Sequence, residues 1–414
     1  MFNIKKHINK YPTNIKANIG MGIASAITLN LVNPYFAKFA LRLGASDYHI
    51  ANLSSLPALV GVLTLIPGAM LIDYAKNKQN ITSKIMLAHK IFYLIIALVP
   101  FIAKQYQASI FVLLVGLMNF PFSVYNTGYQ SSIGDLFKPE NRGTAMSLRN
   151  KYSDMARLIT VLITGNLLSY LSSSESKIII VYQCLFVIAF FVSLFEIYFF
   201  KSFKFPLSNS KEKDKSNYFK TFISVIKQIP KNKQFIIFTI CSLSFHFGWQ
   251  MGWPLFNLYS IKYLFANELW LSFMSIVAGL STIFMVKKWA NLADKRGNSF
   301  TLYIVTALMA ITPLLFVISH SLIQITIFHA IIGTATCGTI LILFNILLEI
   351  VPDKNRTIYI AIYSTLINIS ATIAPLVGVY LKNRYSIQIA LIIVACLRAL
   401  GSFTFYLRNK FSNI

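Results

Sequence analysis

Four charged residues lie close together in an otherwise apolar segment, residues 142–171: Arg149, Lys151, Asp154 and Arg157. If this segment is a helix that begins near Arg142, a rise of 1.5 Å per residue places Asp154 about 18 Å from its start, near the centre of a bilayer. Charges at that depth cost about 2.5–3.5 kcal/mol each and often mark function. We predict that Asp154 carries a coupling proton or is displaced from Arg157 by an anionic solute group. A structural salt bridge to segment 47–75 or 267–292 is the alternative.

Polar side chains also recur at helical spacing in four other apolar segments. Segment 233–264 contains the most complete stripe, at i, i+3, i+4, i+7 and i+11: His246, Trp249, Gln250, Trp253 and Asn257. The other segments contribute Asn119, Ser123, Asn126 and Gln130; Asn30 and Asn33 beside Pro34; and His329 with Thr336. Two tryptophans beside amides are typical of an organic-ligand pocket. The two histidines could also carry a proton, since imidazole titrates near neutral pH. Hydrogen bonding between helices is the competing interpretation of each residue.

The elements that position these residues are apolar helices. The chain has 414 residues, of which 56% are hydrophobic and 12% are charged. We predict an all-α polytopic membrane protein with about twelve spans, because each apolar run is long enough to cross a hydrocarbon core of about 30 Å. The runs are residues 15–43, 47–75, 81–104, 107–136, 142–171, 178–201, 233–264, 267–292, 299–320, 321–349, 355–381 and 386–409.

Basic residues orient these segments in the membrane. Of the 38 Lys and Arg, 26 fall in the terminal arms and alternate loops, and six fall in the other loops. The positive-inside rule therefore predicts that both termini are cytoplasmic, in a bacterial inner membrane. This distribution explains the net charge of +25 without nucleic acid. Four further charged residues are expected to extend from helix ends toward the headgroups: Lys38, Lys90, Glu196 and Arg398.

The chain divides into two similar halves. We predict bundles of six helices at residues 1–201 and 233–414, joined by a polar linker at residues 202–232. Asp47 and Glu268 open corresponding segments 221 residues apart, and Asp73 and Asp294 close them at the same offset. Asp135 and Arg142 match Glu349 and Arg356 at an offset of 214, and Pro34 matches Pro254 at 220. Internal repeats of this kind build transporters in which substrate binds near the midplane of the membrane.

The chain resembles the major facilitator superfamily. The family's cytoplasmic loop motif, Gly-x-Leu-x-Asp-Arg-x-Gly-Arg-Arg, is similar to the sequence from Ala290 through Asp294 to Gly297, and Leu71 and Asp73 represent its first copy. The resemblance implies that the first, fourth, seventh and tenth helices line a cavity. It also implies that the loop acids latch the two halves in one access state. The candidate latch residues are Asp73, Asp294, Asp135, Arg142, Glu349 and Arg356.

We therefore expect a secondary transporter of a small organic solute, coupled to a proton or another ion and working as a monomer in the lipid bilayer. The basic residues at 149–157 favour an anionic or zwitterionic solute. Efflux of amphipathic compounds and a non-transporting membrane sensor on the same scaffold are the alternatives. We expect no cofactor, no metal site and no enzymatic activity. No Gly is followed by Lys, so a P-loop is excluded and the chain is not an ATP-driven pump.

Overall fold

The computed structural model describes residues 11–73, 75, 77–137, 139–171, 175–205, 223–352 and 355–411, and within them every regular element is a helix. Most of the polar linker therefore lies outside the described residues. Eleven helical segments in the described part are long and apolar enough to cross a membrane. The long helix outside that set is α7 (Pro139–Tyr170), because charged and polar residues interrupt its apolar sequence. The predicted all-α membrane fold is confirmed.

The described residues form two compact units. The first lies within Met1–Gly44 and Leu63–Lys213, and the second within Ala45–Val62 and Asp214–Ile414. The boundary falls inside one helix, α4 (Asp47–Asp73), whose first part clusters with the second unit. The other helices of the first unit are α2 (Thr13–Val32), α3 (Phe36–Arg42), α5 (Lys78–Ala97), α6 (Lys104–Leu136), α7 and α8 (Glu175–Lys201). The second unit contains α10 (Lys233–Leu258), α11 (Glu268–Arg296), α12 (Asn298–Val317), α13 (Leu322–Ile350), α14 (Arg356–Arg384) and α15 (Ile387–Phe411).

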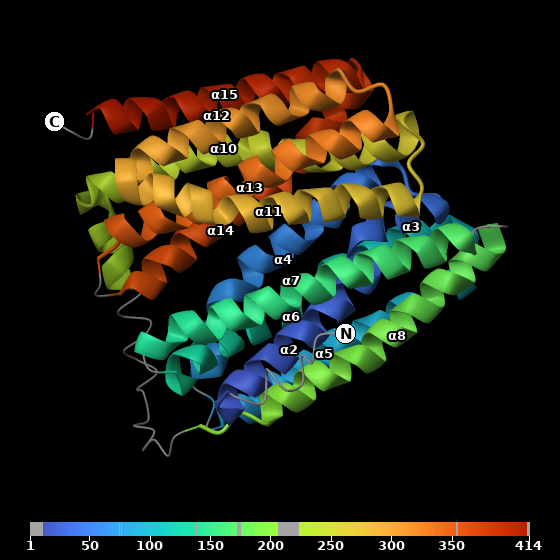
Figure 1. The fold of residues 1–414 in the computed structure, drawn as a ribbon, viewed down its shortest axis with the longest axis horizontal. Helices are drawn as coiled ribbons and strands as arrows, with labels where there is room; N and C mark the ends of the chain where they lie inside the picture. Colours follow the sequence, from blue (N-terminus) through green and yellow to red (C-terminus); the bar gives the residue numbers. More distant parts are fainter. Residues whose placement is uncertain are drawn as a thin grey trace. The chain divides into compact units, whose positions relative to one another are not determined.

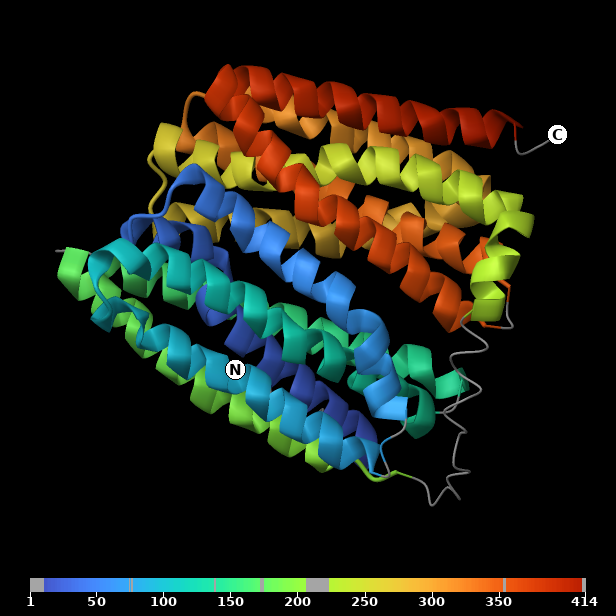
Figure 2. The same ribbon diagram turned by 180° about the vertical axis from the view of Figure 1, so that it is seen from behind.

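Four helix pairs occur in both units. In the first, α2 packs against α7 and α8, while α5 packs against α6 and α8. In the second, α10 packs against α14 and α15 (Figure 2), while α12 packs against α13 and α15 (Figure 1). Each pair in one unit joins helices at the same positions in the order of the chain as its counterpart. The packing thus repeats the sequence relationship between the two halves.

Proline and glycine shape the helices locally. Pro34 lies in a short 3-10 turn, Asn33–Tyr35, which separates α2 from α3 and so interrupts the first predicted span. A ring at that position removes a backbone donor and clashes with the preceding turn. Gly333 of α13 faces the backbone of Ala278 in α11 so closely that an added Cβ atom would lie 2.2 Å from the Ala278 carbonyl oxygen. Small residues at such contacts let membrane helices approach closely.

Each unit has its own core and an apolar outer surface. Aromatic residues dominate the packing of the first unit, where Phe39 of α3 contacts Phe111, Tyr182 and Phe186 with ring centroids 4.7–5.5 Å apart. Many large apolar side chains are exposed instead, among them Phe191 and Ile180 of α8. Lipid favours such surfaces, so these helices expose to the bilayer what a soluble protein would bury.

Candidate functional site

One face of α7 presents three buried donor atoms that make no hydrogen bond to the described residues. Arg149, Ser153 and Arg157 are four residues apart, so their side chains lie one above another on the helix. The Nε atoms of both arginines and the Oγ atom of Ser153 are buried, and none has a hydrogen-bond partner among the described residues. Buried donors normally find partners. This face is therefore suited to a ligand that supplies acceptor oxygens.

Tyr129 of α6 supports Arg149 from behind. The guanidinium carbon of Arg149 lies 5.1 Å from the centre of the Tyr129 ring, which is cation–π geometry. The hydroxyl of Tyr129 donates to Oδ1 of Asn18 at 2.8 Å, and Nδ2 of Asn18 donates to the carbonyl of Ala145 at 3.2 Å. Since Asn18 is fully buried, these bonds hold the ring in place and leave the donors of Arg149 available.

The facing helix, α2, makes room for this face. Gly22 is the residue of α2 that lies opposite it: a Cβ atom there would be 2.5 Å from Ser153 Oγ and 2.6 Å from Arg149 Cγ. Any residue with a side chain would push these groups aside. Gly22 is therefore part of the site, although sequence reasoning did not identify it, because a glycine in an apolar helix carries no signal of what faces it.

Asp154 forms its ion pair within α7. Its Oδ1 atom lies 3.4 Å from Nε of Arg157, and the two side chains are 44% and 27% exposed, respectively. A pair this long and this exposed is weak. Lys151 is exposed on another side of the helix. Thus the structure gives Arg157 a carboxylate that an incoming anion could replace.

The predicted stripe on α10 divides into residues with different surroundings. His246 is buried, and its Nδ1 atom lies 2.8 Å from the carbonyl of Ser242; its ring packs at 5.4 Å on Trp249. Gln250 is also buried, but Nε2 donates to the carbonyl of Ile367 and Oε1 accepts from Ser370, both on α14. The Gln250 amide thus links α10 to α14 by hydrogen bonds.

The remaining stripe residues are more accessible. Trp253 is half-buried and Asn257 is exposed, with Nδ2 3.4 Å from the carbonyl of Trp253. On α6, Asn119 and Asn126 are half-buried and Gln130 is exposed. Two further candidates form hydrogen bonds within their own helices. Asn30 bonds to the carbonyl of Ala26, and His329 bonds to the carbonyl of Ile325. Asn33, in the turn after α2, is exposed.

The predicted latch residues lie at helix ends. Arg142 donates to the carbonyls of Phe137 and Gly134, and so caps the end of α6. Glu349 accepts from Asn298 at 2.5 Å, which joins the end of α13 to the start of α12. Asp135 and Asp294 are exposed, and Arg356 is the half-buried first residue of α14. The side chain of Asp73 lies outside the described residues. The latch stays a prediction.

Three charged residues are buried where the sequence predicted extension toward the headgroups, so that prediction is wrong for them. Lys90 and Glu196 form an ion pair of 2.6 Å with side chains 0% and 2% exposed. Arg398 is also fully buried and donates to the carbonyls of Gly248, Trp249 and Met309 and to the hydroxyl of Thr312. Each of these charged side chains has its partners on other helices, and the hydropathy of a single segment cannot reveal such partners.

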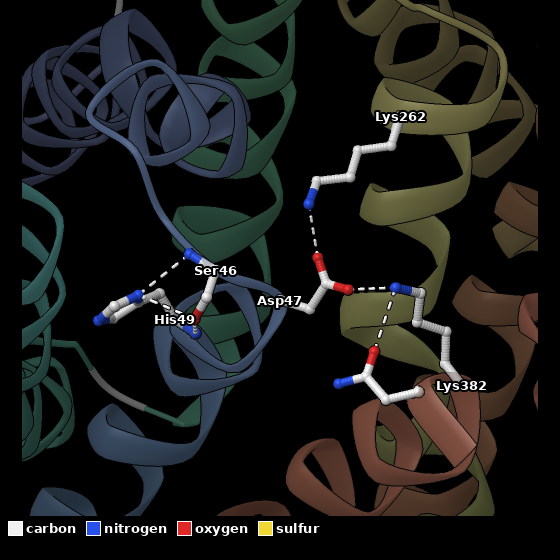
Figure 3. A network of polar contacts seen from close by, with 6 residues as sticks. Ser46, Asp47, His49, Lys262 and Lys382 are labelled. Carbon is white, nitrogen blue, oxygen red and sulfur yellow. Dashed lines mark hydrogen bonds and ion pairs between the residues drawn. The ribbon is translucent and has the colours of Figure 1, made fainter.

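A further group that sequence reasoning missed lies in the second unit (Figure 3). Asp47, the first residue of α4, pairs with Lys262 at 2.7 Å and with Lys382. The two lysines lie near the ends of α10 and α14, in η4 (Tyr259–Tyr263) and in the last turn of α14, respectively. Ser46 and His49 exchange hydrogen bonds at the start of α4 and fix how the helix begins.

Comparison with known proteins identifies the scaffold. The sequence model described as Major Facilitator Superfamily matches residues 19–323 and 288–413. No curated protein matches the chain. The crystal structure of the nucleoside transporter NupG has a TM-score of 0.70 at 13% identity and covers 95% of this chain and 99% of its own. A bacterial homolog of the human lysosomal transporter Spinster, inward-facing and unoccupied, has a TM-score of 0.68 at 12% identity and covers 97% and 98%. At such low identity, these structures show a shared fold.

Proposed function

Because this chain belongs to the Major Facilitator Superfamily, we propose that it is a secondary transporter that carries a small organic anion or zwitterion. The acidic group of the solute binds the donors of Arg149, Ser153 and Arg157 on α7. The observation that supports this assignment is that the Nε and Oγ atoms of these residues are buried in one line and have no hydrogen-bond partner among the described residues. A carboxylate or phosphate would supply acceptors to several of them at once.

Asp154 makes the binding site reversible. With no solute, the carboxylate of Asp154 balances part of the charge of Arg157. When an acidic solute arrives, it replaces Asp154 at the guanidinium, and when the solute leaves, Asp154 returns. A competing internal anion of this kind prevents the arginines from holding the solute too tightly to release it.

Counterflow in proteoliposomes tests the proposal. Vesicles loaded with one unlabelled solute are diluted into the same solute in labelled form, with small carboxylic acids, amino acids, sugar phosphates and uncharged nucleosides as the panel. We expect exchange of at least one acidic solute and none of the nucleosides. Exchange confined to uncharged or cationic solutes would refute the assignment.

Charge-removing variants locate the binding residues. Arg149→Gln and Arg157→Gln should each raise KM for the acidic solute, because a charge-assisted hydrogen bond contributes about 1.5–3 kcal/mol, or roughly 10- to 100-fold. Lys151→Gln is the matched control, since it removes the same charge from an exposed position of the same helix. If the control raised KM as much as the other two, binding would depend on general surface charge and not on this face of α7.

The proposal also specifies the membrane, the orientation of the chain in it and the oligomeric state. We place both termini in the cytoplasm of a bacterial inner membrane, with the transporter acting as a monomer, because basic residues concentrate in alternate loops. A reporter enzyme active only in the cytoplasm, fused after Ile414, should be active. Activity of a periplasmic reporter at the same position would reverse the topology.

A further inference from the structure

The buried ion pair between Lys90 and Glu196 lies in the first unit, on helices α5 and α8. Their charged atoms are 2.6 Å apart and closed off from solvent. Gln79, at the start of α5, donates to the carbonyls of Phe200, Lys201 and Phe203 at the end of α8. These bonds set the register of the two helices, so that Lys90 reaches Glu196.

Groups able to carry a proton surround this pair. On α5, the Nδ1 atom of His89 and the hydroxyl of Tyr93 are buried and have no hydrogen-bond partner among the described residues. The ring of His89 packs at 5.7 Å on that of Tyr93 and at 5.3 Å on that of Tyr125 from α6. A purely structural ion pair does not require unpaired polar atoms beside it, and each such atom costs free energy.

The pair is also connected to the proposed binding face. Nζ of Lys90 lies 5.3 Å from the centre of the Tyr125 ring, while the guanidinium of Arg149 lies 5.1 Å from that of Tyr129. Tyr125 and Tyr129 are four residues apart on α6, so their rings lie on consecutive turns of one helix face. Two cations, one from the ion pair and one from the binding face, thus rest on neighbouring rings.

Other charged groups on the helices packed against α8 are more distant along the bundle, among them Lys78 and Lys84, which precede Lys90 on α5 by 12 and six residues. Lys16, the charged residue of α2, precedes Gly20 by one turn, and Gly20 faces Phe199 near the end of α8. At the opposite end, Lys38 and Arg42 belong to α3, whose Phe39 packs on Tyr182 and Phe186. The groups around Glu196 are therefore His89, Lys90, Tyr93, Tyr125 and Tyr129, with Arg149 of α7 beyond them.

We propose that Glu196, paired with Lys90, is the site at which the coupling proton binds, an inference that rests on the proposed transport of an acidic solute. Lys90 and Glu196 together carry no net charge. In an access state that opens the pair to solution, a proton adds to the carboxylate of Glu196, the carboxylic acid forms, and the ammonium of Lys90 is left uncompensated. One positive charge then remains beside Tyr125.

This added charge couples the proton to the solute. An acidic solute at Arg149 lies near enough to be attracted by the uncompensated ammonium of Lys90, because electrostatic interactions are strong in a region of low dielectric. By reciprocity, bound solute favours protonation of Glu196 to the same extent. One proton and one negative charge move together, and each leaves more readily after the other has left.

Two transport measurements separate this inference from the proposed function. Counterflow needs no gradient and reports solute exchange alone. Accumulation driven by a pH gradient, acidic outside and with no membrane potential, reports coupling. We expect the unmodified protein to show both with the acidic solute found by counterflow. Absence of counterflow for every acidic solute would defeat the proposed function, whereas counterflow without pH-driven accumulation would defeat the coupling.

Variants then assign the coupling to Glu196. Glu196→Gln mimics the protonated acid, so we expect it to retain counterflow and to lose pH-driven accumulation by at least tenfold. Because an unpaired lysine could impair folding, the double variant Lys90→Met with Glu196→Leu replaces both charges with apolar groups of similar size. It should fold, exchange solute and show the same loss of accumulation.

The double variant also tests a purely structural role. If Lys90 and Glu196 only hold α5 against α8, apolar replacement should leave pH-driven accumulation intact, and that result would overturn the proposal. The same accumulation in Glu196→Gln would overturn it as well.

Discussion

Gly22 of α2 and Ser153 of α7 approach so closely that a Cβ atom on Gly22 would lie 2.5 Å from the hydroxyl of Ser153. Real side chains do not pack at that distance, so an alanine would displace Ser153 and the neighbouring Arg149. We predict that Gly22→Ala raises KM for the acidic solute by about tenfold, on the order of 1.4 kcal/mol, with little change in the amount of folded protein. Concentration-dependent uptake in proteoliposomes measures this.

The control for Gly22→Ala is Gly134→Ala. Gly134 is also a helical glycine, on α6, but nothing lies within 4 Å of the position a Cβ would take. This variant should transport like the unmodified protein. Equal effects of the two variants would show that glycine matters for helix flexibility, not for the space beside Ser153.

Asp154→Asn should strengthen solute binding. It removes the anion that competes at Arg157 while keeping the size of the side chain. A pair three residues apart on a helix contributes roughly 0.2–0.5 kcal/mol, so we expect KM to fall by about twofold. Unchanged KM together with an unchanged pH dependence would remove Asp154 from the mechanism.

Asp47 should control the attachment of the first part of α4 to the second unit. It contacts Lys262 and Lys382, and its side chain is 12% exposed (Figure 3). We predict that Asp47→Asn increases amide hydrogen exchange over Asp47–Val62 by about fivefold, since losing a partly exposed ion pair costs about 1 kcal/mol. Mass spectrometry of the purified protein measures this exchange.

High salt should reproduce part of the effect of Asp47→Asn, because ions screen charges that reach the surface. Asp294→Asn, which removes an exposed acid from the last turns of α11, should leave the exchange of Asp47–Val62 unchanged. Equal exchange in Asp47→Asn and the unmodified protein would mean that apolar packing alone keeps this part of α4 in place.

Arg398 should be essential for the stability of the second unit. Its guanidinium joins α10 to α12, and one acceptor is the carbonyl of Met309, which lies four residues before Pro313 and therefore lacks its usual backbone donor. Arg398→Lys retains the charge but cannot reach both helices. We expect a loss of about 1–3 kcal/mol, read as a lower melting temperature in detergent.

The matched control is Arg384→Lys, the same change at an exposed position near the end of α14. It should melt at the temperature of the unmodified protein. If Arg398→Lys melted there too, the hydrogen bonds from its guanidinium to α10 and α12 would contribute little to stability.

The sequence by itself determined the architecture. Apolar runs of sufficient length must become helices in a membrane, since the backbone has no other donors or acceptors there. The residue pairs at nearly constant offsets, such as Asp73 with Asp294 and Arg142 with Arg356, indicated the repeat that the helix packing shows. The charges of α7 were also visible, because they interrupt an apolar run.

Only the tertiary structure decided which polar groups are paired and which are available. Arg149 and Arg157 keep donors without a hydrogen-bond partner among the described residues, whereas both ends of the Gln250 amide bind α14. In the sequence, all three are simply polar residues in apolar segments. Lys90 pairs with Glu196, which is 106 residues away in the sequence, and Asp47 pairs with Lys382, which is 335 residues away. Hydropathy and helical periodicity are properties of one segment, but the pairing of charges depends on which helices pack together and in what register.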